Sequence, residues 1–184
     1  NWTGTEHRGP YYIDGTPPTN PTLASENNGA PSDVWQNSVS DPAFAWTGAL
    51  DSDSGIKGYY WYFGTDAGAD PTVWTAAAGC DPPAVLTGTY YLRVKAEDHA
   101  GNQSSPITVF TFRYDGEAPA SGTISINNGA GTTISLTVVL NNLGANDLSG
   151  IAQMSFGNNA SGPWSPAEPY TASKAGWDLS GYGG

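Results

Sequence analysis

The sequence predicts an all-β protein of two β-sandwich modules in tandem, of which the C-terminal one is incomplete. Three observations lead to this fold class. Charged residues make up only 12% of the chain, whereas 24 glycines, 14 prolines and 7 tryptophans are typical of short strands joined by turns. Short apolar segments alternate with turn residues, and no stretch of a dozen residues has a helical period. A segment at the start of the chain is repeated 101 residues later.

The repeated segment is NWTGTEHRGPYYID, residues 1–14, which matches NQSSPITVFTFRYD, residues 102–115, without a gap. The match aligns Tyr11 with Phe112, Ile13 with Tyr114 and Asp14 with Asp115. The later copy follows YYLRVKAEDHAG and closes a module. We therefore predict that residues 1–14 are a last strand that belongs to, or completes, another module.

The first module is expected over residues 34–115, after a linker and first-strand region at 15–33 that is rich in Pro, Gly, Asn and Thr. Turn residues bound five candidate strands, at 44–47, 58–64, 73–77, 90–96 and 108–114. In the segment 90–96 the even-numbered residues are apolar or aromatic, which predicts one buried face. Trp46 is the expected centre of the core.

The second module is expected over residues 116–184, with strands at 122–127, 133–141, 150–157 and 170–179. Its Ser149-Gly150-Ile151 repeats Ser54-Gly55-Ile56 of the first module. The first module continues for a further 26 residues, 90–115, which have no equivalent before Gly184. The last two strands of the second module are therefore predicted to be missing.

These segments resemble a known family. AFAWTGALDSDSGIKGYYWYFGTD, CDPPAVLTGTYYLRVKAEDHAGNQSS and FTFRYDGEAP resemble the fibronectin type III-like or immunoglobulin-like modules found in tandem in large bacterial surface and secreted proteins. SGTISINNGAGTTISLTVVLNNLGANDLSGIAQMSFGNNASGPWSPAEPY resembles a sister module, and the resemblance covers nearly the whole chain. Sister modules usually continue past W-x-L, here Trp177-Asp178-Leu179, into a further strand that ends in D-x-A-G-N-W-S or -T, and this chain stops before it. The resemblance implies spacers, adhesins or carbohydrate-associated domains, and such a fold does not by itself assign a function.

An incomplete module has an open sheet edge, which another strand can cover. If Arg113 faces solvent, Phe112 and Tyr114 face inward, and the repeat then turns Tyr11 and Ile13 inward. With Trp2, these two residues would form an assembly strand that enters the next copy of the chain, head to tail, and builds an open fibre. The segment offers one strand where two are missing, and the alternative is a piece cut from a longer covalent array.

A calcium site is a second expectation, carried by Asp51 and Asp53 after one strand and by Glu97 and Asp98 after another. These loops could meet at one end of a sandwich, and calcium prefers carboxylate and carbonyl oxygens. The alternative is that the acids only cap turns through backbone hydrogen bonds, since the spacing is not that of an EF-hand loop.

Sugars could be attached or bound. Asn1, Asn102 and Asn159 each begin an N-x-S/T triplet, the acceptor for N-glycosylation. The aromatic run Tyr59 to Phe63 must send alternate rings to opposite faces of a strand. One set is expected in the core, and the other could stack on glycans or on a neighbouring subunit.

Composition excludes several classes of function. A net charge of −11 with six Lys plus Arg argues against nucleic acid as a partner. The sequence contains no stretch of 18 apolar residues, so no membrane span is predicted. The single Cys80 excludes an internal disulfide, and the sequence contains no known catalytic motif. We expect a non-enzymatic, secreted or cell-surface protein: a subunit or repeat of an extracellular fibre made of copies of itself, or alternatively an adhesin or carbohydrate-binding spacer of a larger secreted protein.

Overall fold

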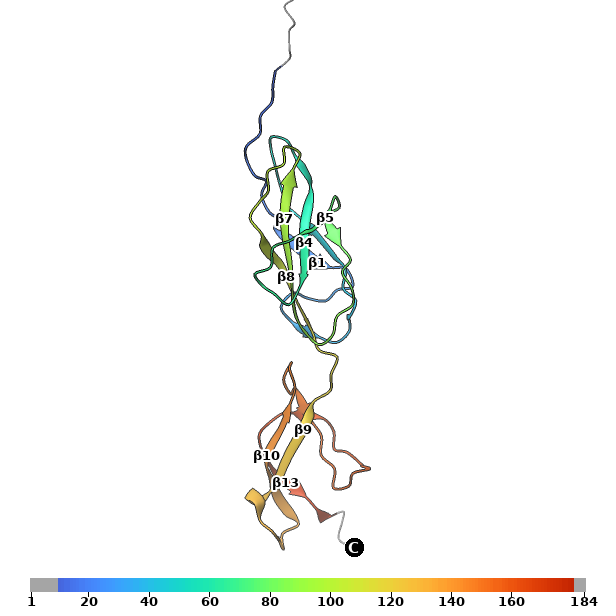
Figure 1. Ribbon diagram of the computed structural model, residues 1–184. Coiled ribbons are helices and arrows are strands. Elements are labelled where there is room, and N and C mark those ends of the chain that lie inside the picture. The colour runs from blue at the N-terminus through green and yellow to red at the C-terminus, as the bar shows by residue number, and fades with distance from the viewer. Residues whose placement is uncertain (1–9, 181–184) are drawn as a thin grey trace, which may run out of the picture. The chain divides into compact units, whose positions relative to one another are not determined.

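The computed structural model describes residues 10–180, and the chain divides into two compact units after Gly116 (Figure 1). The secondary structure confirms the all-β prediction. Within residues 10–179 the only helix is η1, a single 3-10 turn at Asn127–Gly129. No helix within 10–180 has the length and hydropathy that crossing a membrane requires.

The first unit contains two sheets. One has the order β1-β3-β6, with bounds Leu23–Glu26, Phe44–Thr47 and Gly79–Cys80. The other has the order β2-β8-β7-β4-β5, with bounds Trp35–Gln36, Ile107–Tyr114, Gly88–Asp98, Ile56–Gly64 and Val73–Thr75. Neighbouring strands are antiparallel, except that β2 runs parallel to β8.

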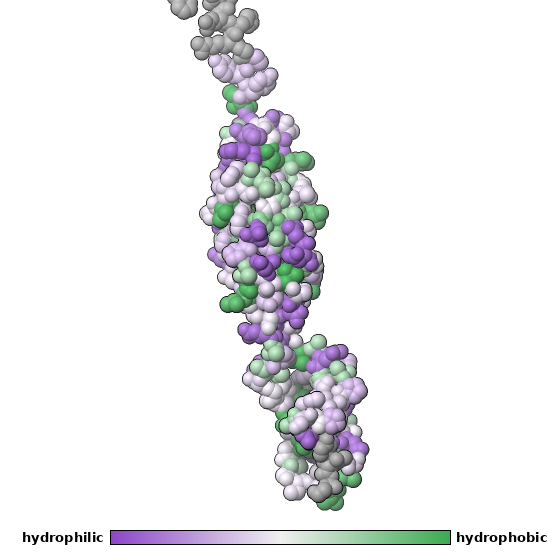
Figure 2. Space-filling model, turned by 90° about the vertical axis from the view of Figure 1, so that its right-hand side faces the viewer, coloured by the Kyte–Doolittle hydropathy of each residue, from purple (hydrophilic) through white to green (hydrophobic). Residues whose placement is uncertain are grey.

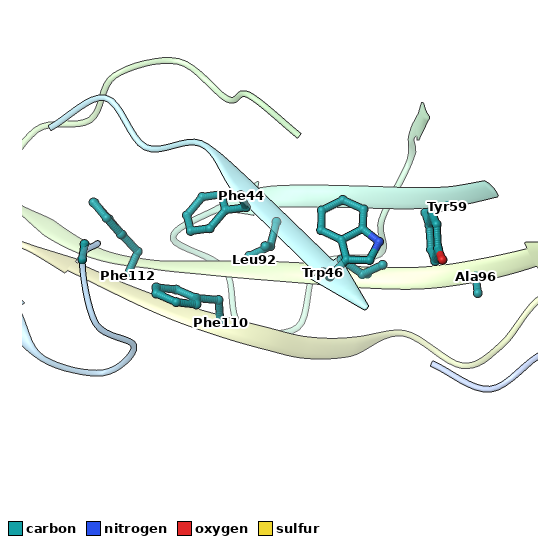
Figure 3. Close-up of a cluster of buried hydrophobic side chains, with 9 residues drawn as sticks. Phe44, Trp46, Tyr59, Leu92, Ala96, Phe110 and Phe112 are labelled. Atoms are coloured by element: carbon teal, nitrogen blue, oxygen red, sulfur yellow. The ribbon is translucent and has the colours of Figure 1, made fainter. Parts of the chain in front are cut away.

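The core of the first unit lies between these sheets. Phe44 and Trp46 of β3 face side chains of β4, β7 and β8 (Figure 3). Trp46 is 1% exposed, and its ring centroid lies 5.5 Å from that of Tyr59. On β7, Leu92, Val94 and Ala96 are all buried, as the alternation predicts. The packing is that of a β-sandwich.

The aromatic run on β4 divides between the two faces of the sheet, as expected. Tyr59, Trp61 and Phe63 pack in or against the core. On the opposite face Tyr60 packs against Trp74 of β5, with ring centroids 5.0 Å apart. Lys95 Nζ lies 5.3 Å from the centroid of the Tyr60 ring, so this face is partly covered by the protein's own side chains.

Cys80 ends β6 beside Phe44, its Cα partner on β3. Burial, together with the nearby Asp81 carboxylate, raises the pKa of the Cys80 thiol from 9.0 to about 12. We expect iodoacetamide at about pH 8 to alkylate Cys80 roughly a thousandfold more slowly in the folded chain than in urea, because reactivity follows the thiolate fraction. Equal rates in the two states would contradict this packing.

The same shift predicts a loss of stability in alkali. A pKa that is raised in the folded state stabilises the fold fully below the unfolded-state value, and this stability disappears as the pH rises from about 9 towards 12. Urea unfolding across this range should show the loss in the natural chain. It should be smaller in Cys80→Ala, and an undiminished loss in that variant would exclude the thiol as its source.

The segment that precedes β1 lies against the first unit. Pro18 and Pro21 are buried. The backbone N–H of Thr19 donates to the carbonyl of Leu50, and the backbone N–H of Leu50 donates to the hydroxyl of Thr19. Asn20 accepts a hydrogen bond from the Ser104 hydroxyl at 2.7 Å. These contacts hold the chain from Pro18 to Pro21 along the loops of the sandwich.

The second unit repeats part of this plan. Its larger sheet has the order β13-β10-β9, with bounds Lys174–Asp178, Thr137–Asn146 and Ala120–Ile126. A separate pair consists of β11, Gln153–Met154, and β12, Glu168–Pro169. The core is small: Val138, Leu140, Leu143 and Phe156 are its buried apolar residues.

Strand bounds in the second unit differ from the predicted ones. The predicted strand 133–141 is β10, which starts at Thr137 because Ser135 and Thr137 donate their backbone N–H groups to side-chain hydroxyls instead of to a strand. The predicted strand 150–157 is reduced to β11, because the backbone at Phe156 pairs with Ser165. The periodicity of the sequence does not reveal such local hydrogen bonds, so it could not predict these strand bounds.

The two units can be matched strand by strand. The order β9, β10, β13 corresponds to β1, β3, β6, and the pair β11-β12 corresponds to β4-β5. The glycines of Ser54-Gly55-Ile56 and Ser149-Gly150-Ile151 are both left-handed, with φ of +80° at Gly55 and +89° at Gly150. Within residues 117–180 no strand corresponds to β7 or β8.

Candidate assembly groove and cation site

Side chains from all three strands of the sheet β13-β10-β9 line an apolar surface of the second unit. A cavity of about 450 Å³ is open there, and we call it the groove. Its large apolar lining residues are Ile124, Ile126, Ile134, Leu136, Leu140, Phe156, Trp177 and Leu179. Figure 2 shows hydrophobic residues reaching the surface of this unit.

Several of these side chains are far more exposed than the core side chains of the first unit. Ile134 is fully exposed, Leu136 is 60% exposed and Ile124 is 59% exposed. In the first unit the inward residues of β7 and β8 are covered, since Leu92 and Phe112 are 0% exposed. Clusters of exposed apolar side chains mark sites of interaction with another chain or a ligand.

Residues 1–14, called here the donor segment, are described from Pro10 onward. Tyr11 is 79% exposed and Ile13 is 93% exposed, and the chain from 10 to 14 belongs to no strand. The predicted assembly residue Trp2 lies outside the described residues.

The repeat partner of the donor segment is β8, which shows the pattern expected of it. Phe112 is buried and Tyr114 packs against the core, whereas Arg113 points outward and pairs with Asp33 at 2.7 Å. The inward assignment of Phe112 and Tyr114 is therefore confirmed. Whether Tyr11 and Ile13 turn inward in a neighbour stays a prediction.

Three carboxylates meet where the chain enters the first unit. Asp14, Asp51 and Asp98, called here the acidic cluster, each offer an oxygen, and these oxygens all lie within 4.8 Å of one another. Asp51 lies in the β3–β4 loop and Asp98 is the last residue of β7. Asp51 Oδ1 accepts backbone N–H groups of Asp53, Ser54 and Gly55 at 3.2, 2.8 and 2.7 Å.

Asp98 is fully buried and held by the turn that follows β7. Its carboxylate accepts the backbone N–H and the side-chain amide of Asn102, both at 2.8 Å. Burial acts to raise the pKa of Asp98, but the hydrogen bonds from Asn102, Gly101 and Ala100 outweigh burial and hold that pKa below its usual value. These hydrogen bonds therefore stabilise the charged form of the Asp98 carboxylate.

The other two predicted calcium ligands are not part of the acidic cluster. Glu97 points to the opposite face of β7, where it pairs with Lys57 at 2.6 Å and accepts a hydrogen bond from Gln103. The bonds from Lys57 and Gln103 lower its pKa. Asp53 is exposed in the β3–β4 loop. The structure thus joins Asp51 and Asp98 and adds Asp14 to them.

Asp14 was missed because it was considered only as the end of a strand. The repeat aligns it with Asp115, which is also an aspartate and is only 7% exposed. The aspartate shared by both aligned segments was the signal in the sequence that Asp14 has a structural role of its own.

The three glycosylation triplets lie in different surroundings. Asn102 uses its side-chain amide twice, donating to Asp98 Oδ2 at 2.8 Å and to the Asp14 carbonyl at 3.2 Å. A glycan on that nitrogen would replace one of the hydrogens. Asn159 is exposed, and its Oδ1 accepts the Ser161 N–H in a surface turn. Asn1 lies outside the described residues.

We therefore expect the chain, produced in a host that glycosylates N-x-S/T triplets, to carry glycan at Asn159 and not at Asn102. Peptide mass spectrometry after enzymatic deglycosylation locates the modified asparagine. Occupancy of Asn102 with Asn159 empty would contradict the hydrogen-bonded role of the Asn102 side chain.

Comparisons with protein-family models, curated proteins and solved structures find no match to this chain. The function is therefore argued from the geometry of the groove, the donor segment and the acidic cluster.

Proposed function

We propose that the chain is a structural subunit of an extracellular fibre, built from two immunoglobulin-like modules. The donor segment of one copy completes the second unit of the next copy, head to tail. One observation carries the proposal: the second unit has no counterpart of β8 within 117–180, while residues 11–13 align with the end of β8 and place Tyr11 and Ile13 at the positions of its inward residues. Within its described residues the second unit therefore lacks a strand that the start of the chain could supply.

Burial of the donor residues supplies the driving force. Fully burying a large apolar side chain contributes about 1.5–3 kcal/mol, so Tyr11 and Ile13 together contribute roughly 3–6 kcal/mol before ordering costs are subtracted. Backbone hydrogen bonds along an open sheet edge add affinity and fix the direction of the inserted strand. The exposed Ile134 and Leu136 would be covered at the same time.

The donor segment supplies one strand where the first unit has two. In the first unit β7 lies between β8 and β4. We therefore expect the completed second unit to have a narrower sheet than the first, with the donated strand placed directly beside β11. The donated side chains would then enter the groove lined by Leu140 and Phe156.

This contact joins two different surfaces of the same chain, so it does not close on itself as a symmetric dimer does. Each added copy again presents a free donor segment and a free groove, and growth leads to an open fibre. The low content of charged residues and the abundance of Ser and Thr in the sequence are compatible with a secreted, glycosylated protein.

Negative-stain microscopy and mass measurement test the proposal together. The protein purified from its natural source should form long filaments that dissolve in denaturant to single chains of about 19.1 kDa plus any glycan. A dissolved mass far above this value after deglycosylation would show covalent joints and exclude strand exchange. Short, uniform particles that bind a glycan array would favour the adhesin or carbohydrate-binding spacer instead.

A further inference from the structure

We infer that residues 10–13 of one copy pair with residues 133–136 of the next copy, which we call the acceptor segment. This pairing rests on the proposed strand donation, in which β11 lies along one edge of the donated strand. The acceptor segment supplies the neighbour at the other edge, and the partner is a second copy of the same chain.

In the first unit β8 has a neighbour on each edge. Besides β7 it pairs with β2, in parallel, with Trp35 and Arg113 as Cα partners. Strand β2 lies in the segment that connects β1 to β3. The corresponding connection in the second unit, from β9 to β10, contains no strand over residues 127–136 (Figure 1). The acceptor segment is the part of this connection that lines the groove.

The backbone of the acceptor segment is largely unpaired. Its residues are all exposed and belong to no strand. Ser135 donates its N–H to the Thr133 hydroxyl at 3.1 Å, and the Leu136 carbonyl accepts the Leu179 N–H at 2.7 Å. Within residues 10–180 the backbone groups of Ile134 have no hydrogen-bond partner. Unpaired backbone groups beside a sheet can accept an added strand.

The backbone of β8 shows which edge of the donated strand faces the acceptor segment. In the first unit the Thr111 carbonyl accepts the Asp33 N–H at 2.8 Å, and the Asp115 N–H donates to the Gln36 carbonyl at 3.0 Å. The odd-numbered residues at the end of β8 therefore turn their backbone groups towards β2 and the segment before it. Because successive residues of a strand alternate, the even-numbered residues turn theirs towards β7.

The repeat transfers this arrangement to the donor segment. Tyr12 aligns with Arg113, so its N–H should face the acceptor segment. Tyr11 and Ile13 align with even-numbered residues of β8, so their N–H groups should face β11. A donated strand with the direction of β8 would run parallel to the acceptor segment, as β8 runs parallel to β2.

Pro10 is compatible with this edge. It aligns with Thr111, whose N–H donates to the Ser32 hydroxyl at 3.1 Å and not to another strand. Because proline has no N–H, Pro10 removes no hydrogen bond between strands at this position.

The side chains of the two segments also suit a contact between copies. Residues 10–13 and 133–136 contain no charged side chain, although the chain carries a net charge of −11, so this contact brings no like charges together. If Ile134 and Leu136 turn into the groove, alternation places Ser135 outward. Ser135 would then lie beside Tyr12, as Trp35 lies beside Arg113 in the first unit.

Disulfide trapping between copies tests the pairing. Two chains, one with Tyr12→Cys and one with Ser135→Cys, each also carrying Cys80→Ala, are mixed, assembled and oxidised with diamide. Ser161→Cys replaces Ser135→Cys in the matched control, since Ser161 is exposed in a surface turn and is not among the residues that line the groove. We expect linked dimers to form at least about tenfold faster with Ser135→Cys, because cysteines whose Cα atoms are more than about 7 Å apart cannot be joined without backbone movement. Equal rates in assembled filaments would overturn the pairing.

Hydrogen exchange of the unmodified filaments separates this pairing from strand donation itself. Pairing with β11 alone would protect the amides of Tyr11 and Ile13, whereas the acceptor segment adds protection of the Tyr12 amide. We expect the Tyr12 amide to exchange at least about a hundredfold more slowly in filaments than in the dissociated chain. Protection of Tyr11 and Ile13 without Tyr12 would overturn the pairing and leave strand donation standing. Fast exchange of all three amides would overturn both.

Discussion

Replacing Tyr11 and Ile13 together by aspartate should abolish filament formation while both units stay folded. Tyr11 and Ile13 are 79% and 93% exposed in the single chain, so the substitutions disturb no packing there. In the assembled state both side chains would enter an apolar groove, where unpaired carboxylates cost several kcal/mol each. Sedimentation and negative-stain microscopy should find single chains only.

Tyr12→Asp is the matched control, since Tyr12 is 92% exposed and alternation places it on the outward face of the inserted strand. This variant should still form filaments, with at most a modest loss. Filaments of normal length from the double variant would refute the donor role, and equal loss in both variants would show that charge alone, not the inward position, disrupts assembly.

Trp46→Ala should give the largest loss of stability in the first unit, about 3–5 kcal/mol, because a large buried side chain is replaced by a cavity. Trp46 lies between the sheets, is 1% exposed and contacts Tyr59 edge to face. Urea unfolding followed by far-UV circular dichroism measures the change. A loss below about 1 kcal/mol would place the centre of the core elsewhere.

Trp46→Phe separates volume from polarity at this position. The indole Nε1 of Trp46 is buried without a hydrogen-bond partner, and phenylalanine removes this unsatisfied donor while keeping an aromatic ring. We expect Trp46→Phe to lower the free energy of unfolding by clearly less than Trp46→Ala does. Equal costs would show that the whole indole volume is needed.

Elements with strong periodicity could be predicted from the sequence. The bounds of β3 agree with the prediction, and the alternation in β7 correctly identified Leu92, Val94 and Ala96 as buried. The two-residue strands β2, β6, β11 and β12 are too short to carry a period, and the parallel pairing of β2 with β8 depends on tertiary contacts.

The candidate cation site was predicted in part. Asp51 and Asp98 were identified because their loops fall at one end of a sandwich, and they do meet. Glu97 was grouped with Asp98 as its neighbour, yet successive residues of a strand point to opposite faces, and Glu97 turns to Lys57. Asp14 could not be placed by local pattern, because it reaches the cluster only through the path of the chain over the β3–β4 loop.

Hydrogen exchange of residues 1–14, measured in the assembled and the dissociated protein, tests strand donation most directly. In the single chain residues 10–13 belong to no strand, so their amides should exchange rapidly. If the strand is inserted, alternate amides of the donor segment should be strongly protected from exchange in the assembled protein. The double variant Tyr11→Asp with Ile13→Asp should not show this protection. Exchange of the donor segment that is as fast in the assembled protein as in a free peptide would contradict the proposal.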